Sequence, residues 1–528
     1  MEEVVVVNKR IGIVGAGISG LLACKYALSM GFTPVVFESR SCIGGVWTKT
    51  IETTKLQTPK SDYQFSDFAW AAEVQEDFPN QYQVLDYLKA YADHFDLVRH
   101  IRFNTKVVSL SYQGQELPGT DDDDAEMEAW TLWGGSCRGI WNVIVVTTEQ
   151  EQGQEQEEVH QFDFVILCVG RFSDVPNIPE FPTEAFQGRK VIHSMDYSEL
   201  DPAAAADLVK GKRVAVVGFQ KSAMDIAMEC STINGVEHPC TVVYRTEHWN
   251  VPDYHPWGIP IAYLYLNRFS ELLVHKPRQG FLLSLLATLL SPLRWGICKF
   301  VETHIKRKLR LDKYGMVPKH SFLKEISSCL ISIVPRGFYD RVDKGSIQLT
   351  KLGPKNSFGF CKQGFSVDDG DPLEVDLVIL CTGFRGTDKL KHIFSSPTFQ
   401  DYIGGSDNAA VPLYRECIHP RIPQLAVLGF SESLSNLYSS EMSCRWVAEL
   451  LKGTFKLPSI KEMEKDIEAW DKYMKQYSGD YYRRSCIGAL QIWYNDQLCK
   501  DMGWNPHRKK GFFADLFQPY GPLDYAQP

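Results

Sequence analysis

The sequence predicts an α/β protein built around parallel sheets, and three observations support this prediction. Residues 10–38 read as an apolar strand, a G-x-G-x-x-G turn, an apolar helix and a second strand. Residues 211–245 repeat this order with a degraded turn. Two similar apolar strands, 162–170 and 373–383, stand on either side of that second unit. We therefore expect two Rossmann-like dinucleotide-binding domains, the second inserted into the first.

The first unit has the residue types that an ADP moiety requires. Gly15 permits a tight turn, Gly17 lets the backbone approach a pyrophosphate at the helix start, and Gly20 allows close helix packing. Ser19 lies in the same turn and is assigned to the same site. Glu38 ends the second strand, where a carboxylate accepts hydrogen bonds from ribose hydroxyls and disfavours a 2′-phosphate.

A glycine pair follows this unit directly. Gly44 and Gly45 can bend the backbone closely around a flat group, and Trp47 can cover that group. A glycine turn beside a core tryptophan is the alternative interpretation of this segment. Its place just after Glu38 favours an extension of the cofactor site towards a ring system, which indicates FAD.

The second unit differs from the first in its turn residues. Gly218 begins the turn, Gln220 stands where the second glycine would be, and Ala223 takes the third position. Lys221 and Ser222 are placed to contact phosphate oxygens at the start of the helix.

The second strand of this unit ends at Arg245 rather than at an acid. A guanidinium there suits a ribose 2′-phosphate, which favours NADP(H) over NAD(H). A βαβ unit without any ligand remains the alternative. Thr382 and Gly383, where the later apolar strand ends, are assigned to the cofactor sites as well.

These units suggest a division of the chain into three parts. Residues 1–209 would form the first part of the FAD domain, 210–377 the NADPH domain, and 378–528 the return to the FAD domain with a C-terminal helical region. An inserted segment, 246–330, is rich in proline and aromatic residues. Hydrophobic periodicity predicts further elements: a helix at 82–94, strands at 103–110, 141–146 and 424–429, and helices at 439–451 and within 460–500.

Three segments invite more than one interpretation. The acidic runs 121–124 and 149–158 are expected to be solvated loops or hairpin tips, because strands flank them and no cation-coordination spacing appears. Residues 281–310 hold an apolar run that is too short to span a bilayer, followed by a basic stretch. This segment either rests on a membrane surface or forms a core helix with a solvated face.

Composition limits the classes of function. A net charge of −9 over 528 residues argues against nucleic-acid binding. The 14 cysteines contain no C-x-x-C pair, which favours free thiols in a reducing compartment over disulfides. No signal peptide or lipidation motif appears, so we expect a cytoplasmic protein, with peripheral attachment to the endoplasmic reticulum through 281–310 as an open alternative. The oligomeric state stays open.

Two dinucleotide sites in one chain imply electron transfer between two nucleotides. A disulfide reductase is disfavoured, because Cys24 and Cys42 near the first site are unpaired by spacing. No residue set with metal-ligand spacing is apparent, so no metal is expected. Molecular oxygen is the common acceptor that remains.

On these residues the chain resembles the flavin-containing monooxygenases, a family of class B flavin-dependent monooxygenases. The matching pieces cover nearly the full length: GAGISG, GGVW, FQGRKVIHSMDY, CTGF, IHPRIPQL and EMSCRW. Three further stretches resemble the plant members that act in systemic acquired resistance, which are pipecolate N-hydroxylases: TTKLQTPKSDYQFSDFAW, GFQKSAMDIA and the C-terminal CKDMGWNPHRKKGFF to PYG.

The resemblance implies a function. NADPH would reduce FAD, O2 would form a C4a-hydroperoxyflavin, and oxygen would pass to a small-molecule amine or amino acid, with L-pipecolate as the expected substrate. Two alternatives stay open. One is a related monooxygenase with another substrate, by S-oxygenation or auxin-type oxidative decarboxylation. The other is an uncoupled NADPH oxidase or redox-sensing flavoprotein.

The chain departs from the family pattern at three places. The signature F-x-G-x-x-x-H-x-x-x-[YF] matches Phe186, Gly188, His193 and Tyr197 with one extra residue before the histidine. Gln220 replaces a glycine in the NADPH turn. The segment in which animal members place an asparagine near the flavin offers Gln57 instead. Gln57 and His193 are therefore the catalytic candidates, with a structural role between the domains expected for the histidine.

Overall fold

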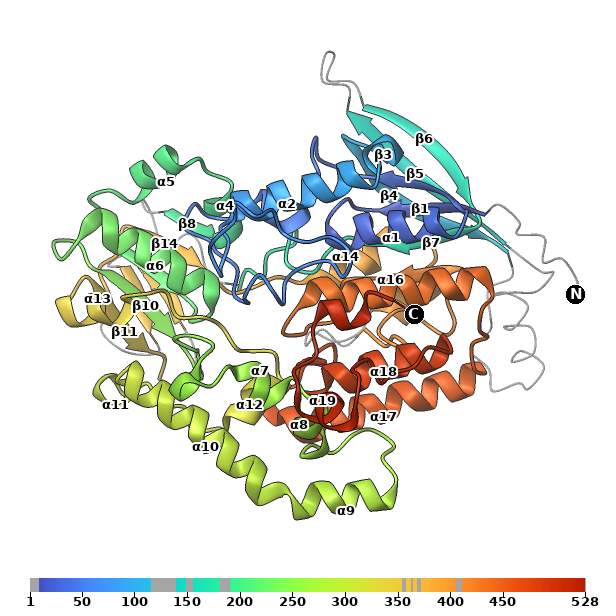
Figure 1. The fold of residues 1–528 in the computed structure, drawn as a ribbon. Helices are drawn as coiled ribbons and strands as arrows, with labels where there is room; N and C mark the ends of the chain where they lie inside the picture. Colours follow the sequence, from blue (N-terminus) through green and yellow to red (C-terminus); the bar gives the residue numbers. More distant parts are fainter. Residues whose placement is uncertain are drawn as a thin grey trace, which may run out of the picture.

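The computed structural model describes two parallel five-stranded sheets, one at the centre of each nucleotide unit (Figure 1). Acidic residues 121–124, together with Phe186 and Gly188, lie outside the residues that the structure describes. The described residues are 9–114, 139–148, 155–180, 190–353, 358–361, 364–367, 372–404 and 411–527.

The first sheet has the strand order β15-β7-β1-β2-β3, and all its pairs are parallel. Buried strands of this kind read as continuous apolar runs because helices or other layers cover both faces. The bounds are β1 (Arg10–Val14), β2 (Thr33–Phe37), β3 (Ile101–Arg102), β7 (Phe164–Leu167) and β15 (Leu425–Val427).

Helices cover one face of this sheet, and a three-stranded antiparallel sheet covers the other. Helix α1 (Ile18–Ser29) packs between the strands and α16 (Asn436–Lys452), and α2 (Gln81–His94) joins the same core. The opposite core contains Trp141, Leu390 and Phe399 from separate elements. Those elements are the antiparallel strands β4 (Thr105–Gln113), β5 (Ile140–Thr148) and β6 (Glu155–Phe162), with helices α14 (Gly386–Ile393) and α15 (Pro397–Ile403).

The five-stranded sheet of the second unit has the order β11-β10-β9-β14-β8 and is also parallel. Its strands follow β7 and precede β15 in the chain, so the second unit is inserted into the first and the predicted fold class is confirmed. The strand bounds are β8 (Lys190–His193), β9 (Val214–Val217), β10 (Cys240–Tyr244), β11 (Ile347–Lys351) and β14 (Leu377–Leu380). Helices α6 (Lys221–Asn234) and α13 (Phe338–Lys344) pack near one face, and the hairpin β12 (Phe358–Cys361) and β13 (Gly364–Val367) belongs to the core on the other.

Two chain segments cross between the units side by side. Pro176 and Phe384 form an isolated antiparallel bridge. The amide N–H of Asn177 donates to the carbonyl of Gly383 at 2.8 Å, and that of Arg385 to the carbonyl of Val175 at 2.9 Å. The apolar strands that precede the two crossings are β7 and β14, as their similar sequences suggested.

Further helices fill the space below the two sheets in Figure 1. They come from the segment after β10 and from the C-terminal part of the chain, which lie close together there. Their bounds are α7 (Ile261–Tyr265), α8 (Arg268–Leu272), α9 (Phe281–Leu289), α10 (Ser291–Lys308), α11 (Leu311–Tyr314), α12 (Phe322–Ser327), α17 (Ile460–Ser478), α18 (Gln491–Asp501) and α19 (Phe512–Phe517). Two short helices, α4 (Ser194–Ser198) and α5 (Pro202–Val209), connect β8 to β9 and lie in the upper part of the view.

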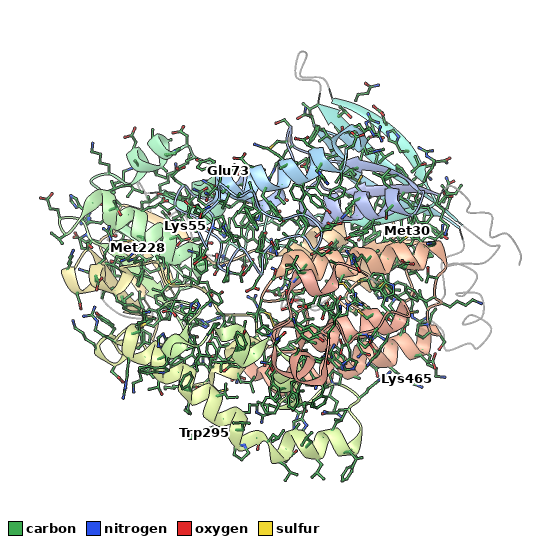
Figure 2. All side chains as sticks on the ribbon, viewed as in Figure 1. Met30, Lys55, Glu73, Met228, Trp295 and Lys465 are labelled. Carbon is green, nitrogen blue, oxygen red and sulfur yellow. A yellow bond between two sulfur atoms is a disulfide. The ribbon has the colours of Figure 1, made fainter. Side chains whose placement is uncertain are left out.

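Helix α9 lies at the lower edge of the molecule with most of its apolar side chains in solvent. Phe281 and Leu282 are 79% and 78% exposed (Figure 1). Trp295 of α10 is 64% exposed and projects from the same edge (Figure 2). No single helix among the described residues is long and apolar enough to cross a membrane, although α9 and α10, bent by 49° at their junction, meet the length and composition requirement together.

Two expectations from the sequence need correction. Cys329 and Cys486 form a disulfide, although free thiols were expected throughout. Their separation of 157 residues hides the pair, because only the packing of α12 beside the segment before α18 brings them together. The acidic run 149–158 is also only partly a hairpin tip, since Glu155–Phe162 forms β6 and 149–154 lie outside the described residues.

Candidate functional site

The first glycine turn is shaped by contacts that leave no room for side chains. Gly15 has φ +101°, and its N–H donates to the carbonyl of Phe37 at 2.8 Å. A Cβ added to Gly15 would lie 2.5 Å from the carbonyl oxygen of Cys168, at the end of β7. A Cβ added to Gly20 would lie 1.8 Å from the carbonyl oxygen of Gly15. These two glycines therefore hold α1 against the strand ends.

Gly17 plays a different part in the same turn. It is the N-cap residue of α1 with φ −77°, and no side chain caps that helix. The first N–H groups of α1 thus point to the space in front of the turn, which is the usual binding position for a phosphate. Ser19, in the first turn of α1, places its Oγ 3.4 Å from that of Ser440 on α16.

The glycine pair after β2 contacts this turn directly. The N–H of Gly44 donates to the carbonyl of Ala16 at 3.1 Å, and a Cβ added to Gly45 would lie 3.1 Å from the Cα of Gly17. Trp47, in the 3₁₀ helix η1 (Gly45–Thr48), donates from Nε1 to the hydroxyl of Tyr63 at 2.9 Å. The two glycine loops therefore form one surface, as their order in the sequence suggested.

Glu38 follows β2 and is buried beside the turn. Its Oε2 accepts from the backbone N–H of Ala16 at 2.7 Å, and its Oε1 from that of Arg40 at 2.9 Å. The hydroxyl of Ser39 also donates to Oε1, at 3.4 Å. A carboxylate has about four acceptor positions, so one remains for a ribose hydroxyl. The narrow glycine cradle, the uncapped helix and this carboxylate together fit the ADP part of FAD.

The second turn reproduces the geometry of the first. Gly218 has φ +132°, its N–H donates to the carbonyl of Val243 at 2.8 Å, and an added Cβ would lie 2.6 Å from the carbonyl oxygen of Cys381. Gln220 is the N-cap of α6 with φ −105°, and no side chain caps this helix either. Ala223 is fully buried at the position that corresponds to Gly20.

Gln220 turns its side chain away from the start of α6. Its Oε1 accepts from the hydroxyl of Ser332 at 2.6 Å, and that hydroxyl also lies 3.1 Å from Oδ1 of Asn250. The Nε2 of Gln220 is buried without a hydrogen-bond partner in this structure. A glutamine is therefore accommodated here because its side chain has a polar partner beside the turn.

The other residues predicted for the second site lie around this turn. Lys221 Nζ is 2.7 Å from Oδ1 of Asp225, whose pKa burial raises to about 6 despite the lysine. Ser222 is exposed in the first turn of α6, and Arg245 is exposed just after β10. The residue types that favour NADP(H) thus lie at the carboxyl ends of β9 and β10, where nucleotides bind in sheets of this kind.

Thr382, Gly383 and His193 lie where the chain crosses between the units. The Nδ2 of Asn177 donates to the carbonyl of Thr382 at 3.2 Å. His193 caps α4: its Nδ1 accepts from the N–H of Met195 at 3.1 Å, and its ring packs edge-on against Phe384 at 5.2 Å. Burial lowers the pKa of His193, which keeps the imidazole neutral and suits a cap.

Gln57, the other catalytic candidate, lies in the segment between η1 and α2. Its side chain is exposed to solvent. The structure does not bring Gln57 and His193 to the same buried position, since His193 is 1% exposed. Their assignment as catalytic residues stays a prediction.

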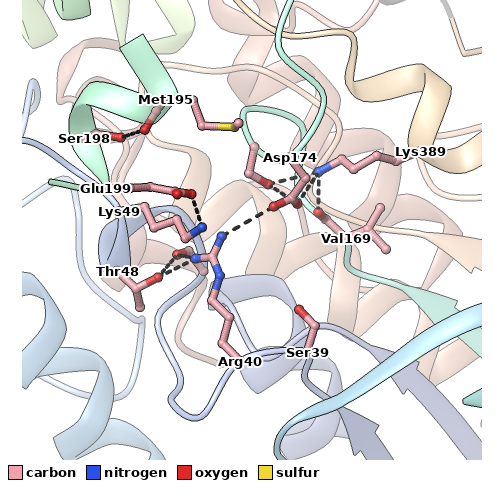
Figure 3. A network of polar contacts seen from close by, with 12 residues as sticks. Ser39, Arg40, Thr48, Lys49, Val169, Asp174, Met195, Ser198, Glu199 and Lys389 are labelled. Carbon is pink, nitrogen blue, oxygen red and sulfur yellow. Dashed lines mark hydrogen bonds and ion pairs between the residues drawn. The ribbon is translucent and has the colours of Figure 1, made fainter. Parts of the chain in front are cut away.

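A polar network at the edge of the two units was not predicted from the sequence (Figure 3). Arg40 lies 3.5 Å from Asp174 through Nη2, and Lys389 donates to the carbonyl of Val169 at 2.9 Å and lies 3.3 Å from Asp174. Although burial opposes it, these cations hold the pKa of Asp174 below its usual value. The network joins the segment after β2, the first crossing and α14, so it fixes the crossing beside the first glycine cradle.

At the same edge an ion pair links the segment after η1 to the segment after α4. Lys49, after η1, pairs with Glu199, after α4 (Figure 3). Sequence reasoning missed these residues because they come from separate segments and no motif spacing connects them.

Comparisons with known proteins agree with this geometry. A family model described as flavin-binding monooxygenase-like matches residues 8–516. Probable flavin-containing monooxygenase 1 of Arabidopsis thaliana is 40% identical, over 98% of this chain and 96% of its own, and putative flavin-containing monooxygenase 2 of the same plant is 38% identical, over 94% and 98%. A caprolactone-bound crystal structure of cyclohexanone monooxygenase aligns with a TM-score of 0.64 at 17% identity, covering 93% of this chain and 97% of that one, which shows a shared fold.

The close packing of the two glycine loops predicts that the substitution Gly17→Ala lowers the affinity for FAD without preventing folding. The backbone of Gly17 tolerates alanine, and the added Cβ would lie 3.4 Å from the Cα of Gly45, an ordinary contact. It would nevertheless occupy the space where a pyrophosphate approaches the backbone. We expect folded protein whose affinity for FAD falls at least about tenfold, or 1.4 kcal/mol, measured by flavin absorbance after gel filtration and by rebinding titration.

Gly280→Ala is the matched control, because Gly280 is also an N-cap glycine with negative φ and has open space around an added Cβ. Full retention of FAD by Gly17→Ala would contradict the assignment of this cradle to the pyrophosphate.

Proposed function

The chain belongs to the flavin-binding monooxygenase-like family, and from that premise we propose that it N-hydroxylates a small amine or amino acid, with L-pipecolate as the expected substrate. It is a flavin-dependent monooxygenase, and its cofactors are FAD and NADPH. O2 is the proposed source of the transferred oxygen atom.

One observation carries the two-nucleotide part of this proposal. The turns at Gly15 and Gly218 have the same backbone geometry, but the strand after the first leads to Glu38 and the strand after the second leads to Arg245. A carboxylate suits an unmodified ribose and a guanidinium suits a 2′-phosphate. We assign FAD to the first turn and NADPH to the second on this contrast.

In the first unit the chain binds and orients the flavin nucleotide. The amides at the start of α1 would bind the pyrophosphate beside Gly15, Gly17, Ser19 and Gly20, while Glu38 accepts from the ribose. Gly44, Gly45 and Trp47 would continue this surface towards the ring system. When FAD is bound and reduced by NADPH, it supplies the activation of O2.

In the second unit the chain positions the reductant. Gly218, Ser222 and Ala223 leave the start of α6 open to a phosphate, and Lys221 is close enough to contact it if its ammonium group moves from Asp225. Thr382 and Gly383 would contact the nucleotides at the crossing. His193 acts as a positioning residue in this proposal, because its Nδ1 caps α4 and does not carry a transferable proton there.

The domain boundaries follow the same division. We propose an FAD domain formed by 1–209 and 378–528, with an NADPH domain at 210–377. Strand β8 and the end of β14 contribute to the second sheet from outside that central range, so the crossing segments belong structurally to both units.

The N-hydroxylation of an amino acid rests on two supports. The stretches at 53–70 and 218–227 resemble plant members of the family with that activity, and the two Arabidopsis relatives match nearly the whole chain. A role in systemic acquired resistance in plant defence would follow from this substrate.

We also propose peripheral contact with a membrane, at the endoplasmic reticulum. Most apolar side chains of α9 and the start of α10 are exposed, and Phe512 and Phe513, the first residues of α19, are 73% and 76% exposed. Leu283 of α9 and Phe512 line one groove, which places the two helices on the same face. Basic side chains lie at and just after the C-terminal end of α10, and two more come just before Phe512, a combination that suits an anionic lipid surface. They include Lys306, Arg307, Lys308, Arg310, Lys509 and Lys510.

The proposed cofactor contrast predicts the effect of Arg245→Ala. Loss of a charge-assisted hydrogen bond costs about 1.5–3 kcal/mol, so the KM for NADPH should rise about tenfold or more while the KM for NADH stays nearly unchanged. Steady-state kinetics with both reductants measure this, with the exposed Arg336→Ala as control. Equal changes for the two reductants would refute the 2′-phosphate contact.

The proposed substrate is tested by product analysis. Purified enzyme with FAD, NADPH, O2 and L-pipecolate should yield a product heavier by one oxygen atom, which takes up label from ¹⁸O2 in mass spectrometry. A panel of thioethers and indole-3-pyruvate serves as comparison. Product only from that panel would favour the related monooxygenases, and hydrogen peroxide with every substrate would favour the uncoupled oxidase.

Membrane contact is tested with vesicles. The double variant Phe281→Ser, Leu282→Ser should weaken co-sedimentation with anionic phospholipid vesicles at least about tenfold, since burying each such side chain contributes roughly 1.5–3 kcal/mol. Val236→Ser, another exposed apolar position at 61% exposure, should leave it unchanged. If wild-type protein stays in the supernatant in the presence of these vesicles, the proposal of membrane contact is wrong.

A further inference from the structure

Two histidines and a glutamate gather in the second unit, outside the nucleotide turns. His248 follows β10, while His320 and Glu325 belong to the start of α12 and the residues before it. The Nδ1 of His248 lies 2.8 Å from Oε1 of Glu325, and Nε2 of His320 contacts Oε2. One nitrogen from each ring and a carboxylate oxygen all lie within 4.8 Å of one another.

The charge of Glu325 makes this cluster unusual. Its side chain is 0% exposed, and an ionised carboxylate removed from water needs a compensating positive charge. Among the described residues, no lysine or arginine forms an ion pair with Glu325. The nearby Lys324 instead places its ammonium over the ring of Tyr481, 5.2 Å from the centroid. The two imidazoles, or a cation between them and the carboxylate, must therefore balance the charge.

The types of side chain in this cluster, and the hydrogen bonds that hold them in place, suit a metal ion. Two imidazole nitrogens and one carboxylate oxygen form a common ligand set for Zn²⁺ and other divalent first-row metals, with further positions left for water. Trp249 supports two ligands: its backbone N–H lies 3.2 Å from Oε2 of Glu325, and its Nε1 donates to the carbonyl of His320 at 2.6 Å. Such outer contacts orient ligands in metal sites.

We propose that His248, His320 and Glu325 form a binding site for a divalent transition-metal ion, with Zn²⁺ as the expected occupant. Ligand atoms around a tetrahedral zinc ion at about 2.1 Å lie about 3.4 Å apart, so the two rings and the carboxylate would rotate towards one another to complete the site. No short motif reveals this site, because 77 residues separate His248 from Glu325.

The ion would act as a structural clip. It would tie the segment after β10 to α12, and the ring of Tyr481, 4.9 Å from that of His320, lies against the same cluster. His248 follows Arg245 by three positions, so the clip would also fix the segment that carries this arginine. The site itself does not depend on the proposed substrate or on either nucleotide.

The test measures zinc directly on FAD-loaded, full-length protein without a histidine tag. After dialysis against a chelator, equilibrium dialysis with Zn²⁺ and elemental analysis should give one tight ion per chain. We expect His248→Ala and Glu325→Gln to weaken this binding at least about 100-fold. His255→Ala, which removes an exposed histidine after β10, should bind like wild type.

His248→Gln provides the second variant, because its amide can still donate to Glu325 while it ligates zinc poorly. Flavin content and circular dichroism establish that each variant is folded. Zinc should raise the thermal midpoint of wild type and His255→Ala and not that of the ligand variants. Wild type without a stoichiometric ion, or ligand variants that bind as wild type does, would overturn the proposal and leave a hydrogen-bonded His-Glu-His network.

Discussion

The close approach of a turn glycine to a backbone carbonyl is the constraint on which both nucleotide units depend. Gly15 packs against the carbonyl of Cys168 and Gly218 against that of Cys381, each at the end of the neighbouring strand. Each glycine also donates its N–H to the carbonyl of the last or next-to-last residue of the strand on its other side. The turn is thereby fixed at the carboxyl edge of the sheet, and the following helix must begin with its free N–H groups in front of that edge.

The same constraint explains which substitutions the second turn allows. At the third position the first unit requires glycine because the carbonyl of Gly15 is only 1.8 Å from an added Cβ, whereas α6 packs with Ala223 there. At the second position both residues have negative φ, so Gln220 is conformationally ordinary. Its side chain finds Ser332 beside the turn instead of filling the space in front of it. The altered turn thus keeps the geometry of a phosphate site.

Because one unit is inserted into the other, the two crossing segments help to set how the two sheets are placed relative to each other. Two short segments carry the chain between the sheets, and they are paired through backbone hydrogen bonds around Asn177 and Gly383. Arg40 and Lys389 converge on Asp174 beside this pair. Arg40 belongs to the first unit, and Lys389 lies on α14, after the second crossing. Their ion pairs with Asp174 therefore resist movement of the crossing segments relative to the first glycine turn. His193 contributes from the other side as the cap of α4.

The sequence by itself determined both βαβ units, the α/β class and the candidate nucleotide residues from Gly15 to Arg245. Glycine spacing and apolar strand runs act within a few residues, so the local backbone encodes them. Strand β9 lies within the unit predicted at 211–245, whereas β7 is shorter than its apolar run, 162–170, because Phe162 ends β6. Only the tertiary structure decided the disulfide between Cys329 and Cys486, the ion pairs of Asp174 and the cluster around Glu325. Those partners are distant in the chain, and which of them meet depends on how whole helices and sheets pack, a property that no short pattern of residues specifies.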